Sequence, residues 1–164
     1  MKNIILNSDD ILNKIRRISF EIIEHNFKER EVYLVGLLPN GKSISKKINE
    51  FISKNSNIKI HHIYLEPNKS NLSLINLIPE NKLNDIKDKI IIFVDDVINT
   101  GETLFYAINQ FIEFNPKGIQ IAVLVERNYN KFPIVPDYRG IRLSTSKKEH
   151  VKVELDEYPK VIIK

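Results

Sequence analysis

Ile90-Ile91-Ile92-Phe93-Val94-Asp95-Asp96-Val97-Ile98-Asn99-Thr100-Gly101-Glu102-Thr103-Leu104 is the stretch that decides the fold of this chain. Its first five residues are apolar and mostly β-branched, which predicts a strand buried on both faces of a parallel sheet. Asp95 and Asp96 follow where the chain leaves that strand, and open α/β sheets bind ligands at the carboxyl ends of their strands. The stretch therefore predicts an α/β fold with a ligand site at this acidic pair.

The residues after the strand combine groups for a diol with groups for an anion. Asp95 and Asp96 can accept hydrogen bonds from the vicinal hydroxyls of a ribose, and their charge favours a nearby Mg²⁺ held through water. Asn99 leads into Thr100-Gly101-Glu102-Thr103. Gly101 permits a tight, left-handed turn, so that backbone N–H groups and two hydroxyls converge on a phosphate where a helix begins near Glu102. Alternatively, the acids only end a strand before an ordinary turn, or belong to a metal-dependent phosphotransfer or receiver domain.

Composition bounds the class of protein. With 164 residues and 42% hydrophobic content, residues 1–164 can form one domain with one core. The chain has no cysteine, which excludes disulfides and thiolate metal sites. No apolar run is long enough for a membrane span, and the first ten residues carry charge where a signal core would be apolar, so we expect a cytoplasmic protein. The net charge of +4 suits phosphate ligands or RNA without requiring either.

Hydrophobic periodicity predicts alternating strands and helices along the chain. Ser8-Asp9-Asp10 provides a cap and acidic first turn for a helix whose apolar stripe runs from Ile11 to Ile23. Beyond that helix the expected elements are a strand at Val32–Leu37, a helix at Lys42–Lys54, strands at Ile58–Leu65 and Ile119–Val125, a helix from Leu104 to Ile112, and an irregular tail with short strands at Val151–Leu155 and Val161–Ile163.

The segment from Asp95 to Thr103 resembles the phosphoribosyl pyrophosphate (PRPP) motif of the type I phosphoribosyltransferases. The resemblance implies that the two acids hold the ribose hydroxyls, that Thr100 to Thr103 hold the 5′-phosphate, and that Mg²⁺ is the cofactor. It also implies the fold of that family: a mostly parallel twisted sheet flanked by helices, with a small hood over a base-binding cleft.

The tail is similar to the PyrR group within that family. The matching segments are Ala122–Arg127, Phe132–Ile134, Pro136–Gly140, Ser144–Ser146 and Val151–Leu155, with Arg17 to Asn26 in register in the first helix. The resemblance implies a homodimer that uses PRPP and uracil or a related nucleobase, or binds a nucleoside monophosphate, and that binds leader RNA. The alternative is a nucleotide-sensing regulator that binds RNA and has lost efficient transfer.

One departure from the family falls on the pyrophosphate loop. Where the family commonly has Lys-Thr-Arg-Gly, this chain has Leu38-Pro39-Asn40-Gly41. Asn40 replaces the arginine and removes a cation near the leaving group, whereas Pro39 makes a cis peptide bond cheaper. A working pyrophosphate loop and a plain Pro-Asn-Gly turn both fit the sequence.

A second departure falls on the loop that closes over PRPP in the family. By register its Asp, Tyr and Arg positions hold Tyr64, Asn68 and Lys69. Lys69 is the candidate catalytic cation for pyrophosphate, although a lysine in such a polar loop is often just solvated.

The resemblance places the base against Glu126 and Arg127, where the family usually has Asp-Arg. Arg127 has an alternative role as a surface ion-pair partner. His61 and His62 are adjacent on a predicted strand, so they face opposite sides and cannot share a metal. The candidate basic face for RNA comprises Arg16, Arg17, Lys46, Lys47, Arg139, Arg142, Lys147 and Lys148.

Overall fold

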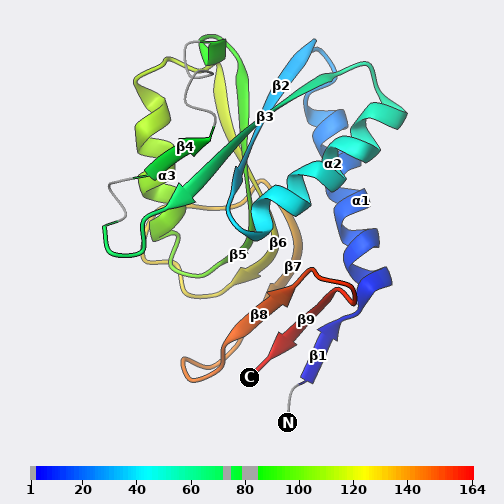
Figure 1. Cartoon of the computed structure of the whole chain (residues 1–164), viewed down its shortest axis with the longest axis vertical. Coiled ribbons are helices and arrows are strands. Elements are labelled where there is room, and N and C mark those ends of the chain that lie inside the picture. The colour runs from blue at the N-terminus through cyan, green and yellow to red at the C-terminus, as the bar shows by residue number, and fades with distance from the viewer. Residues whose placement is uncertain (1–2, 72–74, 79–84) are drawn as a thin grey trace.

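The computed structural model describes residues 3–71, 75–78 and 85–164, and within them six strands form one twisted sheet (Figure 1). The strand order is β4-β3-β2-β5-β6-β7. β2, β3, β5, β6 and β7 are parallel, and β4 pairs antiparallel with β3 at the edge. Their bounds are β2 Glu31–Leu37, β3 Lys59–Pro67, β4 Ile75–Ile78, β5 Ile90–Ile98, β6 Gly118–Arg127 and β7 Tyr138–Leu143. The predicted α/β fold is confirmed.

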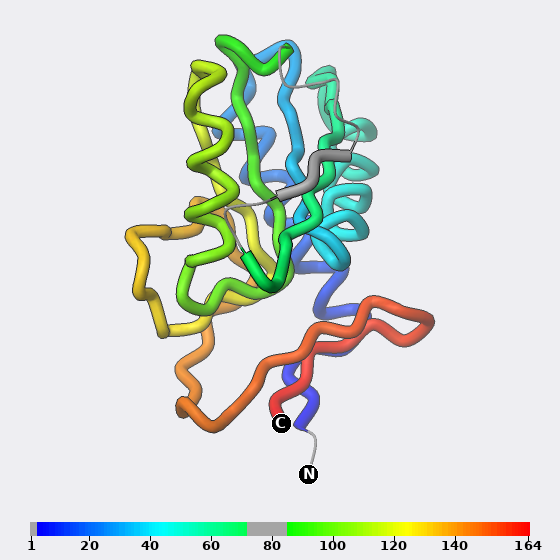
Figure 2. The backbone as a smooth tube through the Cα atoms, turned by 60° about the vertical axis from the view of Figure 1, so that its left-hand side comes forward, coloured from blue at the N-terminus to red at the C-terminus, as the bar shows by residue number. Residues whose placement is uncertain are grey.

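Helices cover both faces of this sheet. α1 (Ser8–His25) and α2 (Asn40–Asn55) lie on one face and α3 (Glu102–Ile112) on the other, as Figure 2 shows. The cap of α1 is Asn7, one residue before the predicted Ser8, and it forms a capping box with Asp10. No helix in the described part of the chain is long and apolar enough to cross a membrane.

A second, antiparallel sheet forms the predicted hood. It pairs β1 (Asn3–Leu6), β9 (Lys160–Ile163) and β8 (Val151–Glu154) in the order β1-β9-β8. In Figure 1 these strands lie below the main sheet, with the two ends of the chain side by side. β1 is absent from the sequence-based expectations, because its pairing partner β9 lies at the other end of the chain.

Besides β1, the strand β4 was not predicted, and β5 and β7 also differ from the prediction. β5 runs to Ile98, because its pairing with β6 continues to Glu126, so the two acids lie within the strand rather than after it. The prediction of an irregular tail was wrong for residues 138–143. They form β7, which pairs with β6 as the last strand of the main sheet. The exposed Arg142 and the partly exposed Arg139 mask the strand pattern, and Gly140 is needed there because a Cβ would lie 2.4 Å from the Leu124 carbonyl oxygen.

Glycine brings the start of α2 unusually close to β5. A Cβ on Gly41 would lie 2.4 Å from the Val94 carbonyl oxygen, and one on Gly36 would lie 2.8 Å from the Gly41 carbonyl oxygen. Real Cβ atoms do not tolerate such distances. The segment from Leu38 to Gly41 therefore packs directly beside the strand that carries the two acids.

Candidate functional site

The turn after β5 closes around a small cavity. Gly101 has φ +82°, the left-handed conformation that the sequence predicts, and α3 begins at Glu102 as expected. The Thr100 hydroxyl accepts a hydrogen bond of 3.2 Å from the Glu102 backbone N–H. The cavity, which we call the loop cavity, has a volume of about 120 Å³ and is lined by Asp95 and residues 97–104. Its position at the N-terminus of α3 suits an anion.

Hydrogen bonds hold the carboxylate of Asp95, which lines this cavity, and that of its neighbour Asp96. Asp95 Oδ1 accepts from the Asp96 N–H over 2.9 Å, and Asp96 Oδ1 accepts from the Val97 N–H over 2.7 Å. Asp96 Oδ2 accepts from Asn40 Nδ2 over 2.7 Å. Burial, and secondarily the adjacent Asp96 charge, raise the pKa of Asp95 well above its ordinary value. A bound cation or hydroxyl donors would offset that penalty.

The donor set fits one particular kind of metal ion. Within the described residues no three His, Cys, Asp or Glu side chains converge. Asp95 and Asp96 thus offer carboxylate oxygens without a full protein cage. Mg²⁺ is commonly bound by one or two carboxylates together with water and substrate phosphates, so this pair suits it.

Leu38 to Gly41 lie beside the acids, with a cis peptide bond between Leu38 and Pro39. Asn40 and Gly41 begin α2, two residues before the predicted helix start, so the plain Pro-Asn-Gly turn is wrong. Asn40 Nδ2 also donates to the Val153 carbonyl oxygen of β8 over 3.1 Å. One amide therefore joins this segment to an acid of β5 and to the hood.

Arg127 is buried, with 7% of its surface exposed, so its alternative role as a surface ion-pair partner is wrong. Its guanidinium donates to Asn99 Oδ1 over 2.9 Å and to Thr145 Oγ1 over 2.7 Å. The Glu126 side chain is also buried and pairs with Arg139. The Glu126 carboxylate thus has a cationic partner inside the protein.

A larger cavity adjoins the loop cavity and shares Asn99 and Thr100 with it. This basic cavity has a volume of about 350 Å³ and is lined by Asn99, Thr100, Arg127, Tyr129, Lys131 and Lys147. The backbone N–H of Lys131 donates to the Thr100 carbonyl oxygen over 3.0 Å, which holds the segment after β6 against the loop. Sequence reasoning missed Tyr129 and Lys131, and it assigned Lys147 only to the candidate basic face for RNA. The available signal was basic and aromatic residues after the end of a central strand.

The residues predicted for the mobile loop line neither the loop cavity nor the basic cavity. Tyr64 lies within β3, opposite Gly36 of β2, which confirms the strand predicted to Leu65. The register that assigned Tyr64 to the mobile loop is wrong, because the parallel pairing carries β3 through this position. Lys69 is exposed in the connection after β3 and does not line either described cavity. Asn68 Oδ1 accepts from the Ser70 backbone N–H over 3.0 Å and orders that turn.

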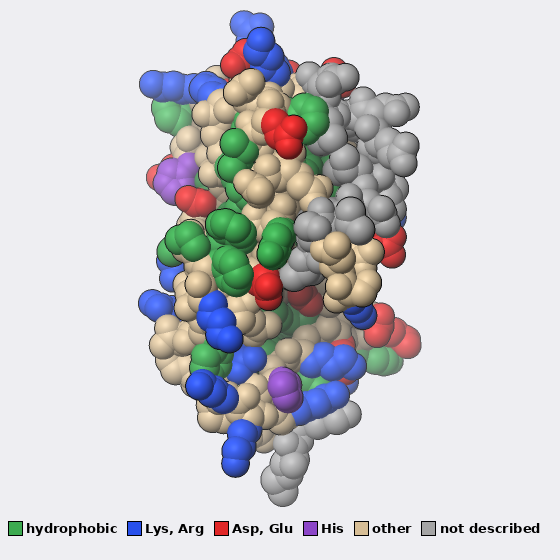
Figure 3. All heavy atoms as spheres, turned by 90° about the vertical axis from the view of Figure 1, so that its left-hand side faces the viewer, with side chains coloured by type: hydrophobic (Ala, Val, Ile, Leu, Met, Phe, Trp, Pro, Cys, Tyr) green, Lys and Arg blue, Asp and Glu red, His purple; other side chains and the backbone are tan. Residues whose placement is uncertain are grey.

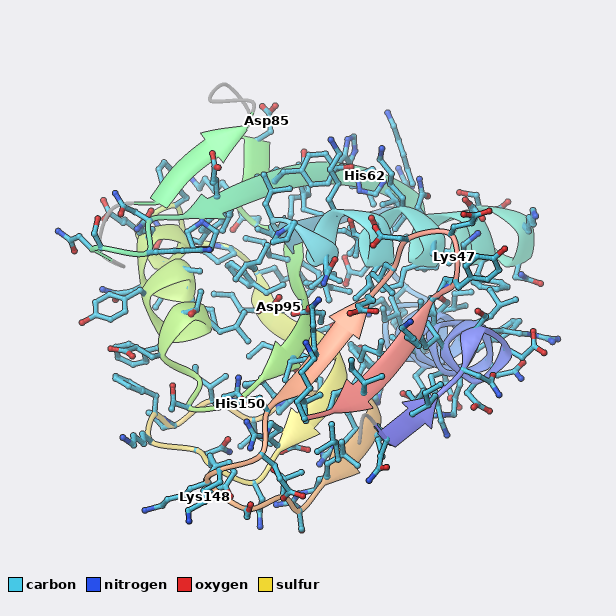
Figure 4. The ribbon with its side chains drawn as sticks, turned by 60° about the horizontal axis from the view of Figure 1, so that its bottom comes forward. Lys47, His62, Asp85, Asp95, Lys148 and His150 are labelled. Carbon is cyan, nitrogen blue, oxygen red and sulfur yellow. The ribbon has the colours of Figure 1, made fainter. Side chains whose placement is uncertain are left out.

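The histidines behave as predicted, and the basic face is divided. His61 bonds to Glu31, whereas His62 bonds to Asn49 of α2, so the two rings face opposite sides of the sheet. Figure 4 shows Lys47 and Lys148 on opposite sides of the molecule, with Asp95 between them at the end of β5. The eight candidate cations therefore do not form one patch within a single chain.

Comparisons with known proteins place the whole chain in one family. A model of the phosphoribosyl transferase domain matches residues 2–158. The bifunctional protein PyrR of Clostridium kluyveri is 37% identical, with 98% of this chain and 94% of the relative covered. The PyrR of Deinococcus radiodurans is 34% identical, with 95% and 89% covered.

Solved structures show the same fold. A hypoxanthine phosphoribosyltransferase of Trypanosoma cruzi superimposes with a TM-score of 0.80 at 14% identity, covering 98% of this chain and 95% of the other. A hypoxanthine-guanine phosphoribosyltransferase of Bacillus anthracis gives a TM-score of 0.70 at 20% identity, covering 87% and 82%.

Proposed function

Since the chain belongs to the phosphoribosyl transferase domain family and to its PyrR members, we propose that it transfers ribose 5-phosphate from PRPP to uracil or a related base and releases pyrophosphate. One observation carries the proposal. Asp95 of β5 and the left-handed turn at Gly101 border the same cavity, so a carboxylate for the ribose hydroxyls and an anion site at the start of α3 adjoin each other.

Substrate binding divides among three neighbouring segments. Asp95 and Asp96 accept hydrogen bonds from the ribose hydroxyls, and Asn99 together with residues 100–103 binds the 5′-phosphate. Leu38 to Gly41 bind the pyrophosphate on one side of β5. On the other side, the base enters beside Glu126 and Arg127, where the basic cavity falls within the roughly 300–1,000 Å³ typical of small-molecule pockets.

Transfer breaks the bond from ribose C1′ to a pyrophosphate oxygen, which leaves with the electron pair. A ring nitrogen of the base forms the new bond to C1′, and its proton passes to the departing pyrophosphate or to water. The sugar becomes cationic on the way, so the carboxylates of Asp95 and Asp96 also stabilise the transition state. Lys69 serves as a point charge for the departing pyrophosphate when its connection closes over the site.

The proposed cofactor is Mg²⁺, which neutralises pyrophosphate charge when bound. Asp95 and Asp96 hold it through water, consistent with a site of two carboxylates. Burial raises the pKa of Asp95, and a bound cation would offset this by favouring the charged carboxylate.

A regulator that binds nucleotide and RNA without efficient transfer is the second candidate. It is favoured by Asn40, a neutral side chain whose amide is already engaged by Asp96 and Val153. The binding residues of the first candidate serve the second equally well. Turnover is therefore the property that separates them.

The deciding experiment follows pyrophosphate release from PRPP and Mg²⁺ with uracil, guanine, hypoxanthine and other bases. We expect turnover with uracil, and loss of turnover in Asp96→Asn. Absence of release with every base, together with measurable binding of PRPP or a nucleoside monophosphate, would leave the regulator. Binding that survives Asp96→Asn unaltered contradicts the role given to the acidic pair.

The proposal includes a homodimer in the cytoplasm, where PRPP and leader RNA occur. Figure 3 faces α3, and hydrophobic side chains gather on that surface, where Phe105 is 37% and Ile112 53% exposed. Burial of such side chains between two copies supports association. Light scattering of the wild type and Ile112→Lys tests it, with a mass of two chains expected only for the wild type.

A further inference from the structure

Arg127 ties two separate parts of the site together. Its Nη1 donates to Asn99 Oδ1 of the turn after β5 over 2.9 Å. Its Nε and Nη2 both donate to Thr145 Oγ1, over 3.0 and 2.7 Å. Nη2 also donates to the Glu149 carbonyl oxygen over 2.8 Å. One guanidinium thus spans from the loop cavity to the segment that leads into the hood.

The surroundings of Arg127 hold it in this position. The Tyr129 ring lies 4.9 Å from the guanidinium carbon, and its hydroxyl donates to the Thr145 carbonyl oxygen. The Glu149 carboxylate accepts from the Ser146 backbone N–H over 2.6 Å and closes the connecting turn. The segment from Thr145 to Glu149 is therefore ordered around Arg127 before it enters β8.

These bonds leave little of the guanidinium for a ligand. An arginine has five N–H donors, and the bonds to Asn99, Thr145 and the connecting segment engage Nε, Nη2 and one N–H of Nη1. At most one N–H, on Nη1, is left to face a base. A role in which Arg127 recognises the base through a pair of hydrogen bonds does not fit this geometry.

We propose that Arg127 is a positioning residue that sets the distance between the phosphate-binding turn and the hood, and so the width of the base cleft. It acts through Asn99 on one side and Thr145 on the other. The planar guanidinium is essential to this role, because its N–H donors point toward both partners at once. A lysine ammonium is a compact charge that cannot reach both partners in a fixed geometry. This inference rests on the proposed function, because it assigns the cleft to a base.

The test is a double-mutant cycle on the two ends of the bridge, measured by kcat/KM for the base. Asn99→Ala and Thr145→Val each remove one partner of a charged group, and each is expected to lower kcat/KM by about tenfold. Because both losses pass in part through Arg127, the double variant is expected to lose clearly less than the hundredfold of additive effects. Additive losses overturn the proposal.

Arg127→Lys separates positioning from a merely structural role. We expect Thr145→Val to cause no further loss in this background, and the KM for the base to rise more than the KM for PRPP, because the two acids are unchanged and only Asn99 loses a partner in the loop cavity. Arg30→Lys, an exposed arginine at the start of β2, is the matched control and is expected to match the wild type. Wild-type kinetics in Arg127→Lys contradict the proposal.

The same cycle distinguishes this inference from the proposed function. If the wild type releases no pyrophosphate with any base, the transferase proposal is wrong, and the cycle is then read from the Kd of uridine monophosphate by calorimetry. Non-additive losses of binding support the bridge, and additive losses overturn it. Asn99→Ala and Thr145→Val keep Arg127 in place, so the test holds even where substitution of Arg127 itself prevents folding.

Discussion

Asn40 Nδ2 lies 2.7 Å from Asp96 Oδ2 and 3.1 Å from the Val153 carbonyl oxygen, so one amide connects the start of α2, an acid of β5 and the hood. An arginine at this position would offer a charge to pyrophosphate. The asparagine instead orients the carboxylate through a hydrogen bond to a charged acceptor, which is about twice as strong as a neutral one.

Substitution of Asn40 by leucine is expected to weaken PRPP binding by roughly ten- to a hundredfold, since a hydrogen bond to a charged group contributes roughly 1.5–3 kcal/mol. Calorimetry with PRPP and Mg²⁺ measures the loss. Asn55→Ala provides the control, because that amide donates to the Phe51 carbonyl oxygen at the far end of α2. Unchanged PRPP affinity in Asn40→Leu shows that Asp96 does not need this partner.

Gly41→Ala is expected to destabilise the protein by roughly 1–3 kcal/mol, because its Cβ would lie 2.4 Å from the Val94 backbone oxygen and push α2 away from β5. Urea unfolding measures the change. Gly118→Ala is the control, where the nearest atom is the flexible Ile90 Cδ1 at 3.1 Å. Equal losses of unfolding free energy in the two variants argue against the close approach of α2 to β5.

The raised pKa of Asp95 predicts how stability depends on pH. The folded chain keeps a proton that the unfolded chain releases, so the stability due to this group falls as the pH rises from its ordinary pKa of 3.8 through the raised value. At neutral pH without ligand, Asp95→Asn is therefore expected to have a higher Tm than the wild type, with the difference shrinking toward pH 4.

Thermal unfolding at several pH values checks this expectation. The exposed Asp156→Asn is the control and is expected to follow the wild type throughout. A lower Tm for Asp95→Asn at neutral pH contradicts it. The same variant should bind PRPP poorly, because a neutral amide attracts Mg²⁺ less than a carboxylate does.

Tyr138, which lies away from the site, gives a second prediction of how stability depends on pH. Burial raises the pKa of its hydroxyl to about 12, and the hydroxyl donates to Gln120 Oε1 over 2.8 Å. Because the folded pKa lies above the ordinary value of 10, the stability due to this group is present below pH 10 and lost as the pH rises toward about 12.

In an ultraviolet titration, Tyr138→Phe is expected to remove the last tyrosine to ionise before unfolding. It is also expected to cost roughly 1–3 kcal/mol in urea at neutral pH, because Gln120 loses a buried partner. Tyr158→Phe, at a tyrosine that is 75% exposed, is expected to remove an early transition and leave stability unchanged. An early transition for Tyr138 shows that its ring is accessible.

Local sequence was sufficient to predict the strands and helices whose hydrophobic pattern is strong. The apolar run before Asp95 predicts the central strand, and Gly101 predicts the left-handed turn and the start of α3, because a run of β-branched residues and a glycine constrain the backbone within a few residues. The hood at residues 151–163 followed from the resemblance of the tail. β7 was missed because only Tyr138 and Gly140 are buried in it, so its composition matches that of a loop.

What the sequence by itself determined is therefore the order of elements and the diol and anion groups around Asp95 and Thr100, which lie close together in the chain. Tertiary structure alone decided what those groups contact. Asn40 meets Asp96 and Val153, and Arg127 meets Asn99 and Thr145, across separations of 18 to 113 residues. Such contacts depend on which strands pair and in which register, and neither composition nor local periodicity carries that information.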